Sequence, residues 1–227
     1  MTVRVQSVLT PTHGRVLIRP GVISEKRVPV SFPAVTIAGF HGYAQSAEDM
    51  MDVLQRIPGA DRCTLISVQA LHRFYTRGDQ KIVASWMTRQ DREETIADNV
   101  AYVDRALGGN ETGTLFDEKS HGLFFIGFSQ GVAMAYRAAL LGKHRAAGII
   151  AIGGDVPPDV KEVPADRWPR VMIAAGAKDQ WYTADKLAAD EAFLKHHSVA
   201  HEIHRSDAGH EVSDGMLAAA ASFIANG

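Results

Sequence analysis

Residues 127–131 read Gly-Phe-Ser-Gln-Gly and place a serine between two glycines at a spacing suited to nucleophilic chemistry. An apolar run at 123–126 precedes them, and a run of small and apolar residues at 132–136 follows. That context predicts a strand, a sharp turn and a helix. On such a turn the serine hydroxyl is exposed, and the glycines leave room for the close backbone. The pattern therefore predicts Ser129 as a nucleophile, with an ordinary glycine-rich turn as the alternative.

A serine hydroxyl needs a base within hydrogen-bond reach and a third group that orients the base. Among the 10 histidines, His210 is favoured as the base because it ends an Asp-Ala-Gly-His loop between the last predicted strand and the last predicted helix. Asp179, which follows an apolar run at 171–175, is favoured as the acid. Asp155, after the preceding predicted strand, is the alternative acid.

The tetrahedral intermediate of acyl transfer requires two preorganised donors for its oxyanion. The backbone N–H of Gln130, directly after the serine, is the first candidate. The second candidate is the N–H of Tyr43, in the loop Gly-Phe-His-Gly-Tyr-Ala-Gln at 39–45. We expect His41, in the same loop, to brace it through a ring hydrogen bond rather than to act as the base.

Short apolar runs alternate with amphipathic runs along the chain, which predicts a mainly parallel sheet with helices on both faces. Two leading strands without a helix between them indicate an antiparallel N-terminal edge, with a hairpin turn near residues 13–14. The candidate residues all follow predicted strands, where the chemistry of such sheets lies. Strands are expected at 3–9, 15–18, 35–40, 64–68, 123–127, 147–152, 171–175 and 202–204, and helices at 46–57, 91–107, 130–141, 183–196 and 212–224.

Composition fits one globular domain over residues 1–227 that needs no disulfide or metal to fold. The net charge of −2 and the lack of long charge runs argue against a nucleic-acid partner. The chain has neither an N-terminal apolar stretch typical of a signal peptide nor an 18-residue apolar run. These features predict a soluble, cytoplasmic protein without stable membrane insertion, and leave a homodimer open. Cys63, the one cysteine, is expected to be buried and unreactive.

Four motifs in register resemble the carboxylesterase/phospholipase family of α/β-hydrolases, which includes the acyl-protein thioesterases. They are the segments at 40–43, 127–135, 176–179 and 209–210. The resemblance implies an α/β-hydrolase fold without a separate lid domain. It also implies hydrolysis of an ester or thioester through an acyl-enzyme, with no metal or organic cofactor. By residue, it implies Ser129 as nucleophile, His210 as base, Asp179 as acid, and Tyr43 and Gln130 as the oxyanion hole.

The long stretch at 71–90 departs from the Pro-rich, Trp-containing loop usual in the family, and Tyr-Ala-Gln replaces the Gly and Asp that many thioesterases carry after the His-Gly pair. These departures put lipid-modified protein or lysophospholipid substrates in doubt. We expect carboxylic esters, with thioesters open, and keep acyl-protein thioesterase or lysophospholipase-like activity as the alternative. A non-catalytic binding protein of the same fold is the alternative from another class. The expected pocket lining is Phe74, Tyr75, Trp86, Met87 and Trp181, with a core position equally open for Trp86.

Overall fold

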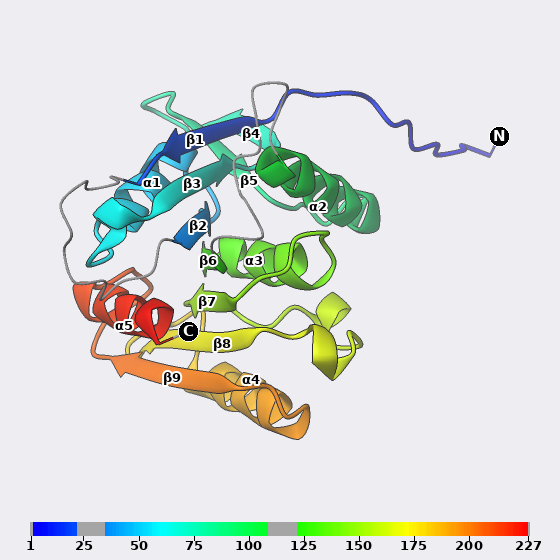
Figure 1. The fold of residues 1–227 in the computed structure, drawn as a ribbon. Coiled ribbons are helices and arrows are strands. Elements are labelled where there is room, and N and C mark those ends of the chain that lie inside the picture. Colours follow the sequence, from blue (N-terminus) through cyan, green and yellow to red (C-terminus); the bar gives the residue numbers. More distant parts are fainter. Residues whose placement is uncertain (1, 22–34, 109–121, 227) are drawn as a thin grey trace.

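In the computed structural model, residues 2–21, 35–108 and 122–226 are described, and they form a seven-stranded sheet covered by helices (Figure 1). Its strands are β1 (Arg15–Arg19), β2 (Val35–Phe40), β3 (Thr64–Gln69), β6 (Gly122–Phe128), β7 (Gly148–Ile152), β8 (Arg170–Gly176) and β9 (His201–Ser206). Their spatial order is β1-β3-β2-β6-β7-β8-β9, and every neighbouring pair is parallel except β1 with β3. The predicted parallel sheet with an antiparallel N-terminal edge is confirmed.

The helices are α1 (Ala47–Gln55), α2 (Arg92–Gly108), α3 (Gln130–Leu140), α4 (Ala184–His196) and α5 (Asp214–Ala225). Two apolar clusters form the core. One includes buried side chains of α2, α3 and α4, and the other includes those of α1 and α5. Figure 1 shows α1 and α5 on one face of the sheet and α2, α3 and α4 on the other. The expected helices on both faces are therefore confirmed, and no described helix has the length and hydropathy to cross a membrane.

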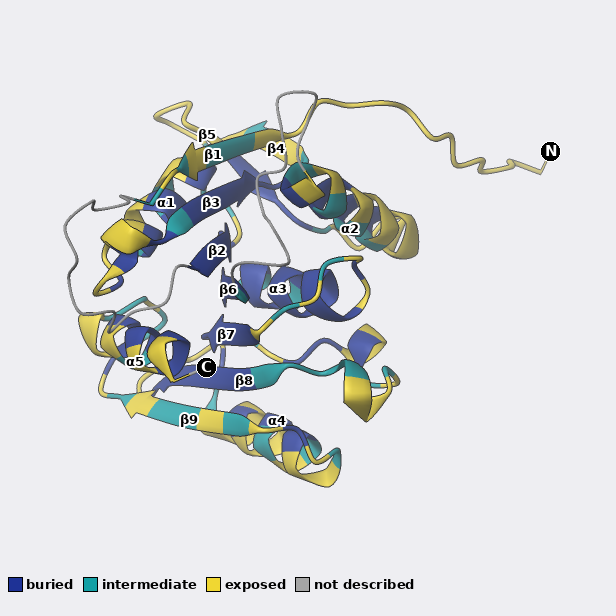
Figure 2. Cartoon of the chain, in the orientation of Figure 1, coloured by how far each residue is buried: buried dark blue, intermediate teal, exposed yellow. Residues whose placement is uncertain are grey.

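Burial follows the order of the strands across the sheet. Every residue of β2 and β7 is buried, whereas the edge strands β1 and β9 alternate between partly buried and exposed residues (Figure 2). Strands covered on both faces read as continuous apolar runs rather than alternating ones. This is why the central strands are the easiest to recognise in the sequence. Cys63 is also buried, and burial raises the pKa of its thiol to about 11, as expected for an unreactive side chain.

The predicted strand at 3–9 is wrong. Residues 2–14 carry no regular structure, and the chain leads away from the body of the molecule (Figure 1). Val3, Val5, Val8 and Leu9 are 71 to 92% exposed. Apolar alternation favours a strand only where a neighbouring strand supplies hydrogen bonds and a surface to pack on. The antiparallel edge is instead formed by β1 pairing with β3, and no hairpin turn forms near residues 13–14.

The atypical stretch at 71–90 contains a β-hairpin of two short strands, β4 (His72–Tyr75) and β5 (Ile82–Ser85), that the sequence did not predict. Its second strand also bridges the loop that follows β2, through backbone hydrogen bonds between Ala84 and residues 44–45. The hairpin is thereby attached to the carboxyl-terminal edge of the sheet, beside the loops that carry the candidate residues.

Candidate active site

Ser129 lies on the predicted sharp turn between β6 and α3, with φ +53° and ψ −119°. A non-glycine residue in this region is strained, and such strain persists only where the surroundings fix it. A Cβ placed on Gly131 would lie 2.0 Å from the Phe40 carbonyl oxygen, and one on Gly127 would lie 2.3 Å from the Gly131 oxygen. Glycine is therefore required on both sides of the serine by backbone that approaches too closely for a side chain.

His210 connects Ser129 to Asp179. Its Nε2 lies 2.8 Å from the Ser129 hydroxyl oxygen, and its Nδ1 lies 2.7 Å from Oδ2 of Asp179. A carboxylate only accepts, so Nδ1 carries the proton and Nε2 is left to accept from the serine hydroxyl. This arrangement can move a proton from a hydroxyl to an imidazole. Asp155, the alternative acid, is instead paired with Lys186 at 3.1 Å and is not a hydrogen-bond partner of His210.

The Asp179 carboxylate is buried, and its second oxygen is also satisfied. Oδ1 accepts the backbone N–H groups of Trp181 at 2.7 Å and Tyr182 at 2.9 Å. Burial would raise the pKa of Asp179, but the hydrogen bonds from His210 and from these two N–H groups outweigh it and hold the pKa below its usual value. Asp179 is therefore ionised at neutral pH and fixed in orientation at both oxygens.

Asp190, on α4, is a supporting residue that the sequence did not reveal. Its buried carboxylate accepts the Tyr182 hydroxyl at 3.0 Å and the Val156 N–H at 3.1 Å. Burial raises the pKa of Asp190 despite these two donors. The contacts join the loop after β7 to the segment whose backbone holds Asp179. No local pattern signals them, because Asp190 lies on an unremarkable helix far along the chain from Val156.

The loop after β2 adjoins Ser129. A Cβ on Gly42 would lie 3.4 Å from the Ser129 Cβ, so the loop passes close to the serine side chain. The backbone N–H groups of Tyr43 and Gln130 donate to no other group within the described residues. The Gln130 side chain accepts the Trp86 N–H at 2.9 Å, which ties the turn to the end of the hairpin. Within the described residues, the N–H groups of Tyr43 and Gln130 are therefore left without an acceptor in the protein.

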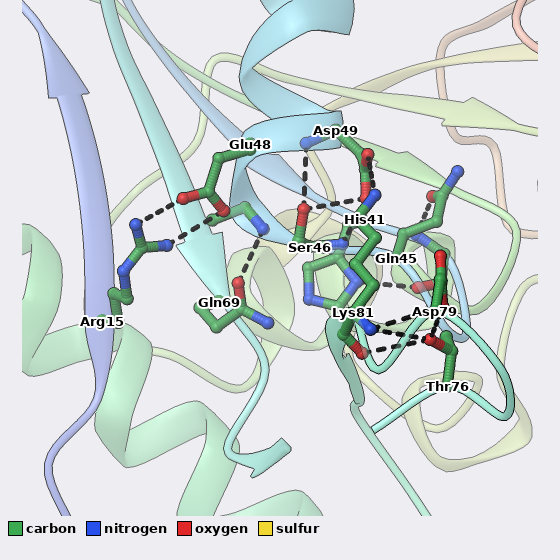
Figure 3. Close-up of polar contacts among 12 residues, drawn as sticks. Arg15, His41, Gln45, Ser46, Glu48, Asp49, Gln69, Thr76, Asp79 and Lys81 are labelled. Atoms are coloured by element: carbon green, nitrogen blue, oxygen red, sulfur yellow. Dashed lines mark hydrogen bonds and ion pairs between the residues drawn. The ribbon is translucent and has the colours of Figure 1, made fainter. Parts of the chain in front are cut away.

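Side-chain contacts brace this loop from three directions (Figure 3). Gln45 accepts the Gly42 N–H through its side-chain oxygen at 2.7 Å. Ser46 caps α1, and Asp49 completes the capping box that its position three residues later predicts. Lys81 of the hairpin contacts the same Asp49 carboxylate at 2.8 Å, while Gln69 at the end of β3 accepts the Ala47 N–H at 2.7 Å. The loop is held by the helix, the hairpin and the sheet together.

His41 is fully buried and braces the loop as expected. Its Nε2 accepts the Ala70 N–H at 3.1 Å, so its Nδ1 carries the proton and donates to the Gly42 carbonyl at 2.7 Å. The carbonyl of His41 in turn accepts the Trp86 indole N–H at 2.8 Å. Burial lowers the pKa of His41, with both ring nitrogens already engaged. This histidine is held neutral and away from Ser129.

A cavity of about 1080 Å³ opens over Ser129 and His210, at the carboxyl ends of the strands. Of the five residues expected to line it, Phe74, Met87 and the 73% exposed Trp181 do so. Tyr75, which is 63% exposed, is not among the residues that line it. Trp86 touches the cavity, but its indole is 1% exposed and packs edge-on against Phe40, so its side chain belongs to the core.

A model of the family described as Phospholipase/Carboxylesterase matches residues 23–226. This range includes each of the residues brought together at the cavity. A search of curated proteins finds no match to the sequence.

Among solved structures, a Bacillus cereus carboxylesterase is 16% identical, covers 94% of both chains and superposes with a TM-score of 0.70. A Zea mays acyl-protein thioesterase 2 is also 16% identical, covers 94% of this chain and 99% of its own, and has a TM-score of 0.69. A carboxylesterase from Mesorhizobium loti is 19% identical and covers 85% and 89%, with a TM-score of 0.66. At these identities the similarity shows a shared fold, that of the α/β-hydrolases.

Proposed function

The chain belongs to the phospholipase/carboxylesterase family of hydrolases, and we propose that it cleaves carboxylic esters through an acyl-enzyme formed on Ser129. The observation that carries the proposal is the continuous pair of hydrogen bonds from Ser129 through His210 to Asp179. A family member that only binds ligands has no need of a strained serine, an oriented imidazole and a buried carboxylate in line. The three residues also occur in the chain order of α/β-hydrolase triads.

In the proposed reaction, the Ser129 oxygen attacks the acyl carbonyl while His210 Nε2 takes the hydroxyl proton. Asp179 keeps the proton of the imidazole on Nδ1 and stabilises the imidazolium that forms. His210 then gives its proton to the leaving oxygen, which departs as an alcohol and leaves an acyl-serine. A water molecule repeats the sequence, releases the carboxylic acid and restores the serine.

The oxyanion that develops in each half of the reaction would be bound by the backbone N–H groups of Gln130 and Tyr43. Both are free of other partners within the described chain, and Gly42 places the loop of Tyr43 close to the Ser129 side chain. Removing one oxyanion donor in another hydrolase costs about 10²–10³ in kcat. A backbone donor is not removed by changing its side chain, so the bracing contacts of His41 and Gln45 are the means of testing this loop.

The cavity sets the class of substrate. Its volume of about 1080 Å³ lies at the upper end of the volumes of small-molecule binding sites. Trp181 and Met87 contribute apolar surface to its wall. We propose a small carboxylic ester as substrate. A thioester reacts through the same groups, because the developing oxyanion and the base are the same and a thiol leaves more readily than an alcohol.

The test is hydrolysis of p-nitrophenyl esters from acetate to palmitate by the native protein, by Ser129→Ala and by Ser222→Ala, whose serine is exposed on α5. We expect Ser129→Ala to lower kcat by on the order of 10⁴. Ser222→Ala should leave kcat within about twofold. An organophosphonate should add one adduct mass to the native protein and to Ser222→Ala, and none to Ser129→Ala.

A Ser129→Ala protein that is folded and active on these esters would contradict the proposal. Alanine and serine carry the same backbone strain at this φ, so we expect Ser129→Ala to fold. Thermal unfolding of the variant checks this. If no acyl ester or thioester is turned over and no adduct forms, the family fold serves binding alone in this protein.

A further inference from the structure

The wall of the cavity carries more positive than negative charge. One carboxylate lines it, that of Asp155, and this group is paired with Lys186 at 3.1 Å. Just outside the lining, Asp159 accepts two hydrogen bonds from the buried Arg137 at 2.7 and 2.8 Å. The same carboxylate lies 3.4 Å from Arg92. The cationic side chains of the lining are Arg73, Arg89, Arg92, Arg137 and Lys186.

Two of these cations are left without a counter-charge. Within the described residues, no carboxylate lies at ion-pair distance from Arg73 or Arg89. Among the described residues, the acceptor of Arg73 is the carbonyl of His13, which carries no charge to offset that of the guanidinium group. Because the whole chain has a net charge of −2, this positive wall is a local feature rather than a reflection of overall composition.

Arg89 lies three residues after Trp86, which contacts the residue that follows Ser129. The Trp86 N–H donates to the side chain of Gln130, the residue after Ser129. Three residues of chain span at most about 11 Å, so the Arg89 backbone lies within that distance of Trp86. Arg73 lies opposite Ala84 in the pairing of β4 with β5, on the same hairpin. Arg73 and Arg89 therefore both lie on the side of the cavity that the hairpin and the segment after it form.

We propose that the substrate carries an anionic group, a carboxylate or a phosphate, separate from the ester that is cleaved, and that Arg73 and Arg89 bind it. Guanidinium groups bind both anions through paired N–H donors, and a cleft lined by one sign of charge concentrates ligands of the opposite sign. This inference rests on the proposed function, because the inference names the class of substrate for that same site.

Two pairs of esters test the inference. The anion lies on the acyl part in p-nitrophenyl hemiglutarate, compared with p-nitrophenyl pentanoate, and on the leaving group in p-acetoxybenzoate, compared with phenyl acetate. The ratio of kcat/KM within each pair is measured in the native protein, Arg89→Gln and Arg73→Gln. Arg77→Gln is the matched control, since it removes the same charge from the hairpin but lies outside the cavity.

We expect the ratio of kcat/KM for the anionic ester to that for the neutral ester to fall on the order of tenfold, for at least one pair, in Arg89→Gln and in Arg73→Gln. A loss of this size is expected when one charged hydrogen-bonding partner is removed. The ratio should stay unchanged in Arg77→Gln. Because intrinsic reactivity cancels when the same two esters are compared across variants, a ratio unchanged in both cavity variants for both pairs overturns the inference.

Calorimetric titration of the native protein with glutarate and with inorganic phosphate separates the two anion sources and needs no turnover. Binding of one of them that weakens about tenfold in Arg89→Gln supports the inference even if the ester chosen is poor. Ser129-dependent hydrolysis of neutral esters, with neither anion bound and no change in the ratios, leaves the proposed function standing and removes this inference alone.

Discussion

Asp179→Asn is the most informative single change, because the structure dictates how the new amide must lie. The Asp179 oxygen Oδ1 accepts two backbone N–H groups, from Trp181 and Tyr182, while Oδ2 faces Nδ1 of His210. The asparagine oxygen keeps the two backbone donors only if its NH₂ group faces His210. An NH₂ group there donates to Nδ1, so the imidazole proton moves to Nε2, where it blocks acceptance of the serine proton.

The magnitude follows from the alternative orientation of the amide. If the NH₂ group faced the two backbone N–H groups instead, both donors would be unsatisfied in a buried site, at about 1–3 kcal/mol each. The two unsatisfied donors together cost about 2–6 kcal/mol. Since 1.36 kcal/mol corresponds to a factor of ten, the tautomer of His210 with its proton on Nδ1 becomes rarer by about 30-fold to about 10⁴-fold. Loss of the charge beside the imidazolium adds to this. We expect kcat to fall by about 10³–10⁴, as it does for triads in general.

The assay is kcat on p-nitrophenyl acetate, with thermal unfolding to check that each variant is folded. Asp155→Asn is the matched control, because it makes the same substitution at the alternative acid and should cost less than about tenfold. Asp179→Ala removes the charge without imposing a tautomer, so it should cost no more than Asp179→Asn. An Asp179→Asn protein within tenfold of native activity, or a larger loss in Asp155→Asn, would refute the reasoning.

Two further predictions concern stability. In Gly131→Ala the new methyl group would lie 2.0 Å from the Phe40 oxygen, so the free energy of unfolding should fall by about 2 kcal/mol or more. The control is Gly108→Ala, whose methyl group meets nothing within 4 Å and should not destabilise the protein. Equal midpoints of urea unfolding for the two variants would contradict the close packing at Gly131. Burial lowers the pKa of His41, so the unfolded state takes up a proton before the folded state does, and stability should decrease as the pH falls below about 6.5, by at most about 1.4 kcal/mol per unit. His41→Asn should lose this part of the slope between pH 7 and pH 5, and identical slopes in the two proteins would show that His41 is not held neutral.

Features with a local physical cause could be predicted from the sequence. The capping box of Ser46 and Asp49 begins α1, and the turn at Ser129 follows from glycines that flank it after an apolar strand. The candidate residues could be grouped because parallel strands place their carboxyl ends at one edge of the sheet. His210 was distinguished from the other histidines by its position between the last strand and the last helix.

Features that depend on distant partners could not be predicted. The strand expected at 3–9 has suitable side chains, but the edge of the sheet is completed by β1 and offers it no described partner. The two strands of the hairpin are short, and β4 is mostly exposed, so they lack a clear apolar pattern. Asp190 supports the segment after Asp179 through its contacts with Tyr182 and Val156. Neither an alternation of apolar and polar residues nor a sequence motif carries information on such contacts.

The geometry at Ser129 is set by the sheet rather than by the turn alone. The Ser129 N–H donates to the Ile152 carbonyl at the end of β7, and the Gly153 N–H donates to Ala174 in β8. From β8 the series continues, because the Lys178 N–H donates to the Ala208 carbonyl in the loop that carries His210. A backbone hydrogen bond thus joins each successive loop to the next, from the serine to the histidine. Because neighbouring parallel strands fix these bonds, the sheet holds the serine, acid and base at their spacing.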